Sequence, residues 1–350
     1  MWGDSSINRR CRLAFVSVFI LIGALFLMGR PAQAVTLIPP SIELIDVSPG
    51  EVVTTKVKLF NETATAVTLY PSRANFTALD ETGTPNIQPA SEEDLAGWLT
   101  LEPGPFTIQP GERLEIPVEV KVPADATPGG HFATILFSPQ PPAAVQGGQL
   151  AIGQKIGTLV LVRVTGIINE SGSIVEFDTD SGQHTFTRLP IDFLLRFKNS
   201  GNVHIRPTGT VTIRNLIGGT SATVPINSGL GAVLPLSTRK FEATWARQPG
   251  STANKGFFQE IGQEWQNFAL GPYTASVNLT FGLSNDKSDQ AILRFWVVPW
   301  RLLLVGALVI LLLVLLIIFL IKRYNRWVIS RAQKPPQEPD QTKPGDKKTG

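Results

Sequence analysis

The run from Leu302 to Ile321 limits most strongly what this chain can fold into, because its twenty residues include neither a charge nor a proline. About twenty apolar residues are what a helix needs to cross a bilayer core of about 30 Å. Trp300 precedes the run, and Tyr324 and Trp327 follow it, at the positions of an interfacial aromatic belt. The sequence therefore predicts one transmembrane helix over residues 300–321.

A second apolar run lies near the N-terminus. Three arginines precede the apolar core from Leu13 to Met28, and the small-residue pattern Ala32-Gln33-Ala34 follows it. This order is typical of a cleaved secretory signal, so we expect a signal peptide over residues 1–34; an uncleaved membrane anchor is the alternative. Cleavage would remove Cys11, the one cysteine of the chain. Disulfides, thiol catalysis and cysteine-based metal sites are then excluded.

Charges beside the C-terminal run predict its orientation. Residues 322–331 contain four basic residues and no acid, whereas Arg301 is the one charge directly before the run. An excess of Lys and Arg marks the cytoplasmic side of a membrane helix. We therefore expect a single-pass cell-membrane protein with residues 35–299 outside the cell. Residues 322–350 are expected to form a disordered basic cytoplasmic tail, because almost no apolar residue follows Arg331.

Residues between the two apolar runs follow strand periodicity. From Arg113 to Val122, apolar residues occupy every second position, which is the pattern of a half-buried strand. Turn-forming triplets such as Ser48-Pro49-Gly50 and Gln109-Pro110-Gly111 separate runs of this kind. No long segment between the two runs has apolar residues at helical spacing. We therefore expect an all-β ectodomain of the sandwich type.

The strand pattern occurs twice. A second set of strands begins after Gly166 and repeats features of the first set, including a strand that ends in an asparagine-containing turn. The paired segments are Val57–Thr63 with Leu195–Gly201, and Gln109–Arg113 with Leu234–Arg239. The offset between the two sets suits a domain of ordinary size. The sequence thus predicts two tandem immunoglobulin-like β-sandwiches, at residues 35–166 and 167–298.

Short motifs follow one another in a fixed order through the first predicted sandwich. They are Ser48-Pro49-Gly50-Glu51, a strand that ends at Asn61, Gly97-Trp98-Leu99, Gln109-Pro110-Gly111-Glu112, the segment Pro123–Gly130 and a late strand at Leu159–Val164. With the predicted signal peptide, paired sandwiches, membrane helix and basic tail, this order resembles the WxL-interacting proteins of Gram-positive bacteria. The resemblance implies a first domain that contacts peptidoglycan and a second domain that engages host or partner surface proteins. The opening pattern is also similar to that of periplasmic pilus chaperones.

Residues that could support catalysis are sparse. His131, His184 and His204 are the only imidazoles, and no two of them have the spacing of a ligand pair. We expect His131 to pack in the core and His204 to be solvated. The acidic cluster Glu92-Glu93-Asp94 fits the first turn of a short helix better than a divalent cation site. The sequence therefore predicts no enzyme, no cofactor and no metal site.

Two groups of aromatic residues are candidate contact surfaces. Trp98 could stack on a sugar ring, although packing in the core is the more common role of such a residue. Phe257, Phe258 and Trp265 lie in an insertion between strands, at residues 250–269, which either folds back on the sandwich or faces a partner. We take these three as candidate partner-binding residues and expect them to be exposed.

These observations favour a non-enzymatic, membrane-anchored cell-surface adhesion or scaffold protein that binds cell-wall peptidoglycan or a surface protein through its β-sandwich domains. The alternative is a chaperone-like accessory subunit that assembles surface structures by edge-strand complementation. A cell-wall hydrolase is disfavoured because the sequence offers no catalytic constellation. Nucleic-acid binding is not expected, because acidic residues outnumber basic ones between residues 35 and 301.

Overall fold

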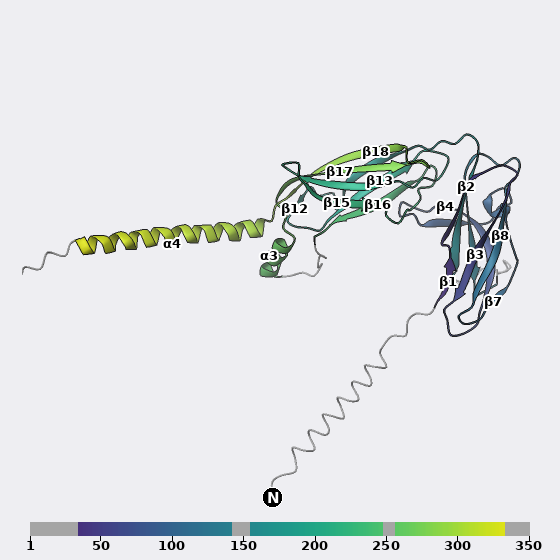
Figure 1. Ribbon diagram of the computed structural model, residues 1–350, viewed down its shortest axis with the longest axis horizontal. Helices are drawn as coiled ribbons and strands as arrows, with labels where there is room; N and C mark the ends of the chain where they lie inside the picture. Colours follow the sequence, from purple (N-terminus) through teal and green to yellow (C-terminus); the bar gives the residue numbers. More distant parts are fainter. Residues whose placement is uncertain (1–33, 142–154, 248–255, 333–350) are drawn as a thin grey trace, which may run out of the picture. The chain divides into compact units, whose positions relative to one another are not determined.

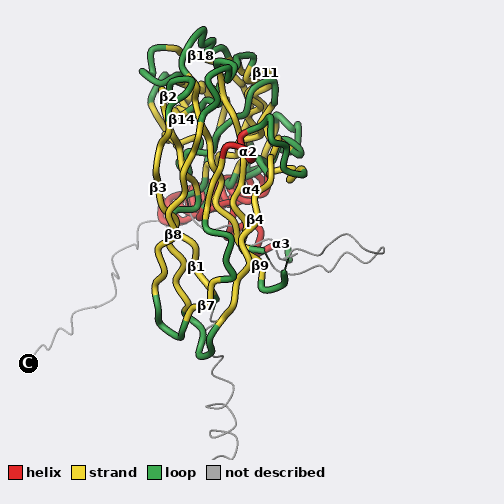
Figure 2. Tube along the Cα trace, turned by 90° about the vertical axis from the view of Figure 1, so that its right-hand side faces the viewer, coloured by secondary structure: helices red, strands yellow, loops and turns green. Residues whose placement is uncertain are grey.

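The computed structural model describes residues 34–141, 155–247 and 256–332. Strands make up most of the part before the C-terminal helix. Within the described residues, helix occurs at α2 (Leu95–Trp98), α3 (Phe257–Gln266) and α4 (Trp300–Ala332), drawn in red in Figure 2. The predicted signal peptide lies outside the described residues except for Ala34, as does the predicted tail beyond Ala332.

The first sandwich consists of two sheets (Figure 1). Buried apolar side chains from both sheets form one hydrophobic core. One sheet contains, in order, β1 (Val35–Ile38), β3 (Val52–Asn61), β8 (Arg113–Lys121) and β6 (Leu99–Leu101). The other contains, in order, β2 (Ser41–Val47), β10 (Ile156–Val164), β9 (Gly129–Ser138), β4 (Val67–Ala78) and β5 (Pro85–Gln88), and β7 (Phe106–Ile108) pairs with β4.

Period-two alternation places one face of each strand in this core. In β8, the side chains of Ile116, Val118 and Val120 are fully buried, as the alternating pattern predicts. β8 pairs antiparallel with β3, and Val57 lies opposite Ile116. Burial of each such side chain contributes about 1.5–3 kcal/mol, so the two central strands hold much of the stability of the first sandwich.

The chain changes sheets close to its first strand. β1 pairs antiparallel with β3, whereas β2 pairs parallel with β10 in the other sheet. Pro39 and Pro40 lie between β1 and β2, and proline cannot donate to a strand ladder. One short segment therefore supplies an edge strand to each sheet and ties the two sheets together.

The second sandwich has a three-stranded and a five-stranded sheet. The smaller sheet contains, in order, β11 (Gly172–Thr179), β13 (Ile191–Asn199) and β16 (Thr238–Trp245). The larger contains, in order, β12 (Thr185–Phe186), β18 (Lys287–Val297), β17 (Gly271–Phe281), β14 (Thr208–Asn215) and β15 (Thr220–Ile226). Aromatic rings fill the core, where Phe295 contacts Phe193, Trp245 and Tyr273. The prediction of two immunoglobulin-like sandwiches is confirmed.

The chain divides into two compact units whose limits differ from the strand boundaries. The first unit comprises residues up to Ser173 together with residues 198–205 and 232–239. The second comprises residues 174–197, residues 206–231 and the chain from Lys240 onward. The predicted domain limits at residues 166 and 298 stay predictions.

α4 is a single apolar helix. By length and composition, its stretch Trp300–Ile329 could cross a membrane, and the most apolar part of this stretch is not buried against the rest of the described chain. The helix continues to Ala332, beyond the predicted end at Ile321. The expectation of a disordered tail is therefore wrong for residues 322–332. Lys and Arg are good helix formers, and the first proline after the apolar run is Pro335.

Candidate functional site

Trp98 is a core residue of the first unit. It ends α2 and is 4% exposed, and its ring centroid lies 4.5 Å from that of His131. A buried indole offers no free face to a sugar ring, which corrects the carbohydrate-stacking expectation for Trp98. His131 packs against it as expected, and its Nε2 lies 2.9 Å from the carbonyl oxygen of Thr127.

The acidic cluster before α2 contacts strand β4. Arg73 Nη2 lies 3.3 Å from Glu92 Oε1, and Asn75 Nδ2 donates to Asp94 Oδ2 at 3.3 Å. Asp94 also stands at the N-cap position of α2, where a negative charge is favourable. Within the described residues, no group of three or more His, Cys, Asp or Glu side chains has an arrangement that could hold a metal ion.

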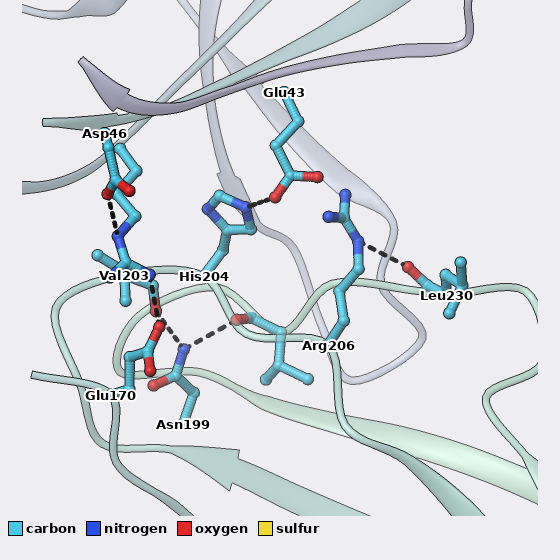
Figure 3. Close-up of polar contacts among 10 residues, drawn as sticks. Glu43, Asp46, Glu170, Asn199, Val203, His204, Arg206 and Leu230 are labelled. Atoms are coloured by element: carbon cyan, nitrogen blue, oxygen red, sulfur yellow. Dashed lines mark hydrogen bonds and ion pairs between the residues drawn. The ribbon is translucent and has the colours of Figure 1, made fainter. Parts of the chain in front are cut away.

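His204 is buried, not solvated. Its side chain is 4% exposed, and its Nε2 lies 2.5 Å from Glu43 Oε1, as Figure 3 shows. The imidazole also meets the ring of Phe132 edge-on, with centroids 5.8 Å apart. The expectation of solvation is wrong because residues 198–205 pack within the first unit. The turn is polar in sequence, but this packing buries the His204 side chain.

Further polar contacts hold residues 198–205 in place. Asn202 donates from Nδ2 to the carbonyl of Ile167 at 2.9 Å, and accepts at Oδ1 from the N–H of Asn169 at 2.8 Å. The N–H of Gly130 donates to the carbonyl of Asn202 at 2.8 Å. One loop residue therefore joins strand β9 to the segment after β10.

Arg163 of β10 lies beside these contacts. Its Nη1 lies 2.5 Å from Glu170 Oε1, and its Nε lies 3.4 Å from Asp46 Oδ1; both carboxylates appear in Figure 3. The Arg163 and Glu170 side chains are mostly buried, so solvent screens this pair less than a surface pair.

A groove of about 650 Å³ opens on the first unit beside the Asn202 contacts. Its lining is uncharged and combines apolar side chains with small polar groups: Phe76, Thr77, Ala78, Gly130, Phe132, Ile167, Asn169, Ser200, Gly201, Asn202, Leu234, Pro235, Leu236 and Ser237. Ile167 and Leu236 are 88% and 80% exposed. Leu236 also has a φ of +57°, a conformation that residues other than glycine rarely adopt.

Sequence reasoning missed this groove. Its residues come from five separate stretches of the chain, and each stretch alone has the composition of an ordinary strand or turn. The one local signal was Leu234-Pro235-Leu236, an apolar triplet in a segment that otherwise has turn character. An apolar side chain in a turn suggests a contact surface only where the fold brings other exposed apolar side chains beside it.

The second candidate surface is formed by α3 in the second unit. Phe257, Phe258 and Trp265 are 46%, 85% and 72% exposed, as expected for partner-binding residues. Half of the predicted insertion, residues 257–266, is helix, whereas residues 250–255 lie outside the described part. Partner binding by these three residues stays a prediction.

Acidic side chains fasten α3 to the start of α4. Glu264 is fully buried; its Oε1 accepts from Arg301 Nη1 at 3.0 Å, and its Oε2 accepts from the N–H of Leu302 at 3.0 Å. Glu260 pairs with Arg188 and lies 3.5 Å from Arg301 Nη1. Both acidic side chains of α3 therefore bind basic side chains or a backbone N–H of the same unit.

Comparisons with known proteins leave the family open. No family model matches the chain, and no curated protein matches it. Similar solved structures include the class 5 fimbriae chaperone CfaA, at 11% identity and TM-score 0.35. This match covers 75% of the present chain and 99% of the CfaA chain. The CsuC–CsuE chaperone–tip adhesion subunit complex of Acinetobacter baumannii matches at 12% identity and TM-score 0.33, over 75% and 98% of the two chains.

The E. coli chaperone DraB matches at 8% identity and TM-score 0.31, over 75% of this chain and 95% of that chain. Similarity at this level carries no functional argument. The resemblance to WxL-interacting proteins rests on the sequence motifs alone and stays a prediction.

Proposed function

We propose that this chain is a non-enzymatic, membrane-anchored surface protein that holds an apolar segment of a partner protein in the groove of its first unit. The observation that carries the proposal is the groove itself, with Ile167 and Leu236 exposed beside it. Binding would remove these apolar side chains from water, which is the main source of affinity at protein interfaces. Polar groups of the lining would then fix the orientation of the bound segment.

The chemistry of the lining supports a protein ligand. Anionic wall polymers call for Lys or Arg, and the groove has neither. Sugar rings call for a free aromatic face, but Phe132 already packs on Phe76, with centroids 5.9 Å apart, and on His204. Peptidoglycan binding is therefore the weaker candidate and becomes one outcome of the test.

The predicted signal peptide and the positive charges after the apolar run support a location of both sandwiches outside the cell. α4, which could cross a membrane, would then hold the groove near the cell surface. We propose this topology together with the binding function, since a partner in the groove must be another extracytoplasmic protein.

Edge-strand complementation has less support from the described strands. A donor or acceptor strand needs a free edge, yet β10 pairs with β9 on one side and with β2 on the other. β1, β5 and β6 are edge strands of only three or four residues, whereas the edge strands β2, β11 and β15 have seven or eight residues, so this alternative is confined to these longer edges. β16 carries Arg239, Lys240 and Glu242, and charges of this kind protect an edge from pairing.

The test uses the full chain in its native membrane. A photo-crosslinking amino acid at Leu236 should trap a surface protein, whereas the same probe at Ile217, a similarly exposed residue in the turn between β14 and β15, should not. The trapped protein, once purified, should bind the full chain in lipid nanodiscs. Leu236→Asp should weaken that binding on the order of tenfold or more, and Ile217→Asp should leave it unchanged.

Two results would overturn the proposal. Equal trapping at Leu236 and Ile217 would mean that the groove is not a specific site. Binding of the full chain to purified wall material, lost in Leu236→Asp, would assign the groove to peptidoglycan instead of a protein.

A further inference from the structure

We propose that α3 lies in the interface of the membrane that α4 enters, with its aromatic face in contact with lipid. This inference goes beyond the proposed function, because the groove plays no part in it. The binding partner that we infer for the exposed aromatic side chains of α3 is the lipid surface.

α3 is attached to the first turn of α4. Glu264 binds the N–H of Leu302 and the guanidinium of Arg301, both in that turn. α3 lies beside the start of α4 in Figure 1. Because Glu264 is fully buried, this attachment is a fixed part of the second unit.

The sequence of α4 indicates the level of the membrane surface. From Leu302 to Ile321 the helix has no charge, and from Gly306 onward the residues of this run are exposed in the described chain. Trp300 and Arg301, which precede this run, are residues that favour the headgroup region, and the guanidinium lies over the Trp300 ring at 4.8 Å. The boundary of the bilayer therefore falls at the first turn of α4, to which α3 is attached.

The outward face of α3 has the chemistry of a lipid contact. Phe258, Ile261 and Trp265 recur at the spacing of one helical face, and Gly262 lies on the same side. Glu260 and Glu264 lie on the other side and are paired with arginines. The exposed face is thus aromatic and uncharged, as an interfacial helix requires.

The aromatic surface continues past the helix. Phe268 and Leu270 are also exposed, between α3 and strand β17. Tryptophan and phenylalanine in water lose the favourable contacts that the headgroup–acyl boundary offers them. A lipid surface is the occupant that the attachment to α4 brings within reach, whereas no described contact points to a protein at this face.

This contact would give the second unit two attachments to the membrane. α4 anchors the chain, and α3 beside it would restrict rotation of the second unit about the α4 axis.

The test uses the full chain with Cys11→Ser, which removes the one cysteine, in phosphatidylcholine nanodiscs without any partner protein. An environment-sensitive fluorophore is attached at Gly262→Cys, where an added side chain meets no atom within 4 Å. Labels at Leu303→Cys, in the first turn of α4, and at Ile217→Cys serve as positive and negative controls. Lipids that carry a nitroxide near the headgroup should quench the labels at 262 and 303 to a similar extent and leave the label at 217 unchanged.

Substitution of the aromatic face supplies a second arm. Phe258→Ala combined with Trp265→Ala should reduce quenching at 262, whereas Gln259→Ala, a change of an exposed polar residue of the same helix, should not. Intrinsic fluorescence provides a label-free measurement: brominated lipid should quench the wild-type chain more than Trp265→Phe.

A label at 262 that is not quenched, beside a label at 303 that is, would overturn the proposal. If the label at 262 instead responds only when a purified surface protein is added, α3 is a protein-binding site. Either outcome leaves the groove experiment at Leu236 unaffected, so failure of this inference is distinguishable from failure of the proposed function.

Discussion

Asn61 and Asn199 make the same contacts at the ends of corresponding strands, one in each sandwich. Each is fully buried, and each donates from Nδ2 to the backbone carbonyl four residues later, at Thr65 and Val203, at 2.8 Å. Each also donates to a carbonyl directly before a proline-containing turn, that of Ile108 at 2.9 Å and that of Val233 at 2.8 Å. The internal repeat in the sequence is therefore a repeat of one structural device, a turn locked by a buried amide.

Replacement of either asparagine by aspartate tests this device. Asn61→Asp or Asn199→Asp places an acceptor where a fully buried amide donated to two backbone carbonyls, so the free energy of unfolding should fall by about 3 kcal/mol. Urea unfolding followed by tryptophan fluorescence measures the loss. Asn278→Asp, at an exposed position of β17, is the matched control and should be within about 0.5 kcal/mol of the wild type. Equal effects at 61 and 278 would contradict the prediction.

The contact between His204 and Glu43 should hold residues 198–205 in place within the first unit. His204→Ala removes both the hydrogen bond and the ring that meets Phe132, so stability should fall by about 2 kcal/mol. His204→Phe retains a ring and should lose less. Hydrogen exchange of the Gly201 and Asn202 amides measures the effect locally, and unchanged exchange in His204→Ala would show that the other contacts suffice.

Glu264 should contribute more to the attachment and stability of α3 than the other residues of this helix. Glu264→Ala leaves the N–H of Leu302 without its partner and removes one of the two carboxylates beside Arg301. Stability of the second unit should fall by about 2 kcal/mol, and proteolysis within α3 should become faster. Gln259→Ala, on the exposed side of α3, should change neither. Proteolysis of α3 at the wild-type rate in Glu264→Ala would contradict the prediction.

Glu115 should make stability depend on pH in the acid range. Hydrogen bonds from Lys56 and Lys58 lower the pKa of Glu115 from 4.5 to about 2. Because the folded pKa lies below the unfolded one, the contribution is complete above pH 4.5 and is lost as the pH falls toward about 2. The wild type should have a higher thermal unfolding midpoint than Glu115→Gln at neutral pH. This difference between the two midpoints should become smaller as the pH falls from 4.5 toward about 2. Both ion pairs of Glu115 are exposed, so added salt should reduce the difference between the two midpoints. A difference that stays constant with pH would contradict the prediction.

The proposed topology predicts which parts of the chain a protease reaches. Protease added to intact cells with a permeable wall should digest residues 35–299 and spare an epitope placed after Gly350. Permeabilised membranes, as the control, should lose the epitope. Loss of the epitope in intact cells would reverse the orientation.

Local patterns were enough for the architecture. The alternation from Arg113 to Val122 predicted β8 and its buried face, because neighbouring side chains of a strand point to opposite sides whatever lies around them. The apolar run after Leu302 predicted α4 for a similarly local reason. Its true end at Ala332 was missed, since a change from apolar to basic residues ends a membrane span but does not end a helix.

The candidate sites depended on contacts between distant parts of the chain. Trp98 and Phe258 are both aromatic residues near acidic side chains in the sequence, yet the first is buried and the second exposed, and only packing distinguishes them. α3 was expected as a loop because its apolar residues span barely two turns, too few for a periodic signal.

What the sequence by itself determined is therefore the order of elements: two sandwiches of alternating strands, a paired asparagine turn and one apolar C-terminal helix. Only the tertiary structure decided which polar side chains are buried in contacts with other residues and which apolar side chains stay exposed. His204 meets Glu43 across 161 residues, and Glu264 meets Leu302 across 38. Periodicity reports which face of an element is apolar, but burial depends on what the rest of the chain brings against that face.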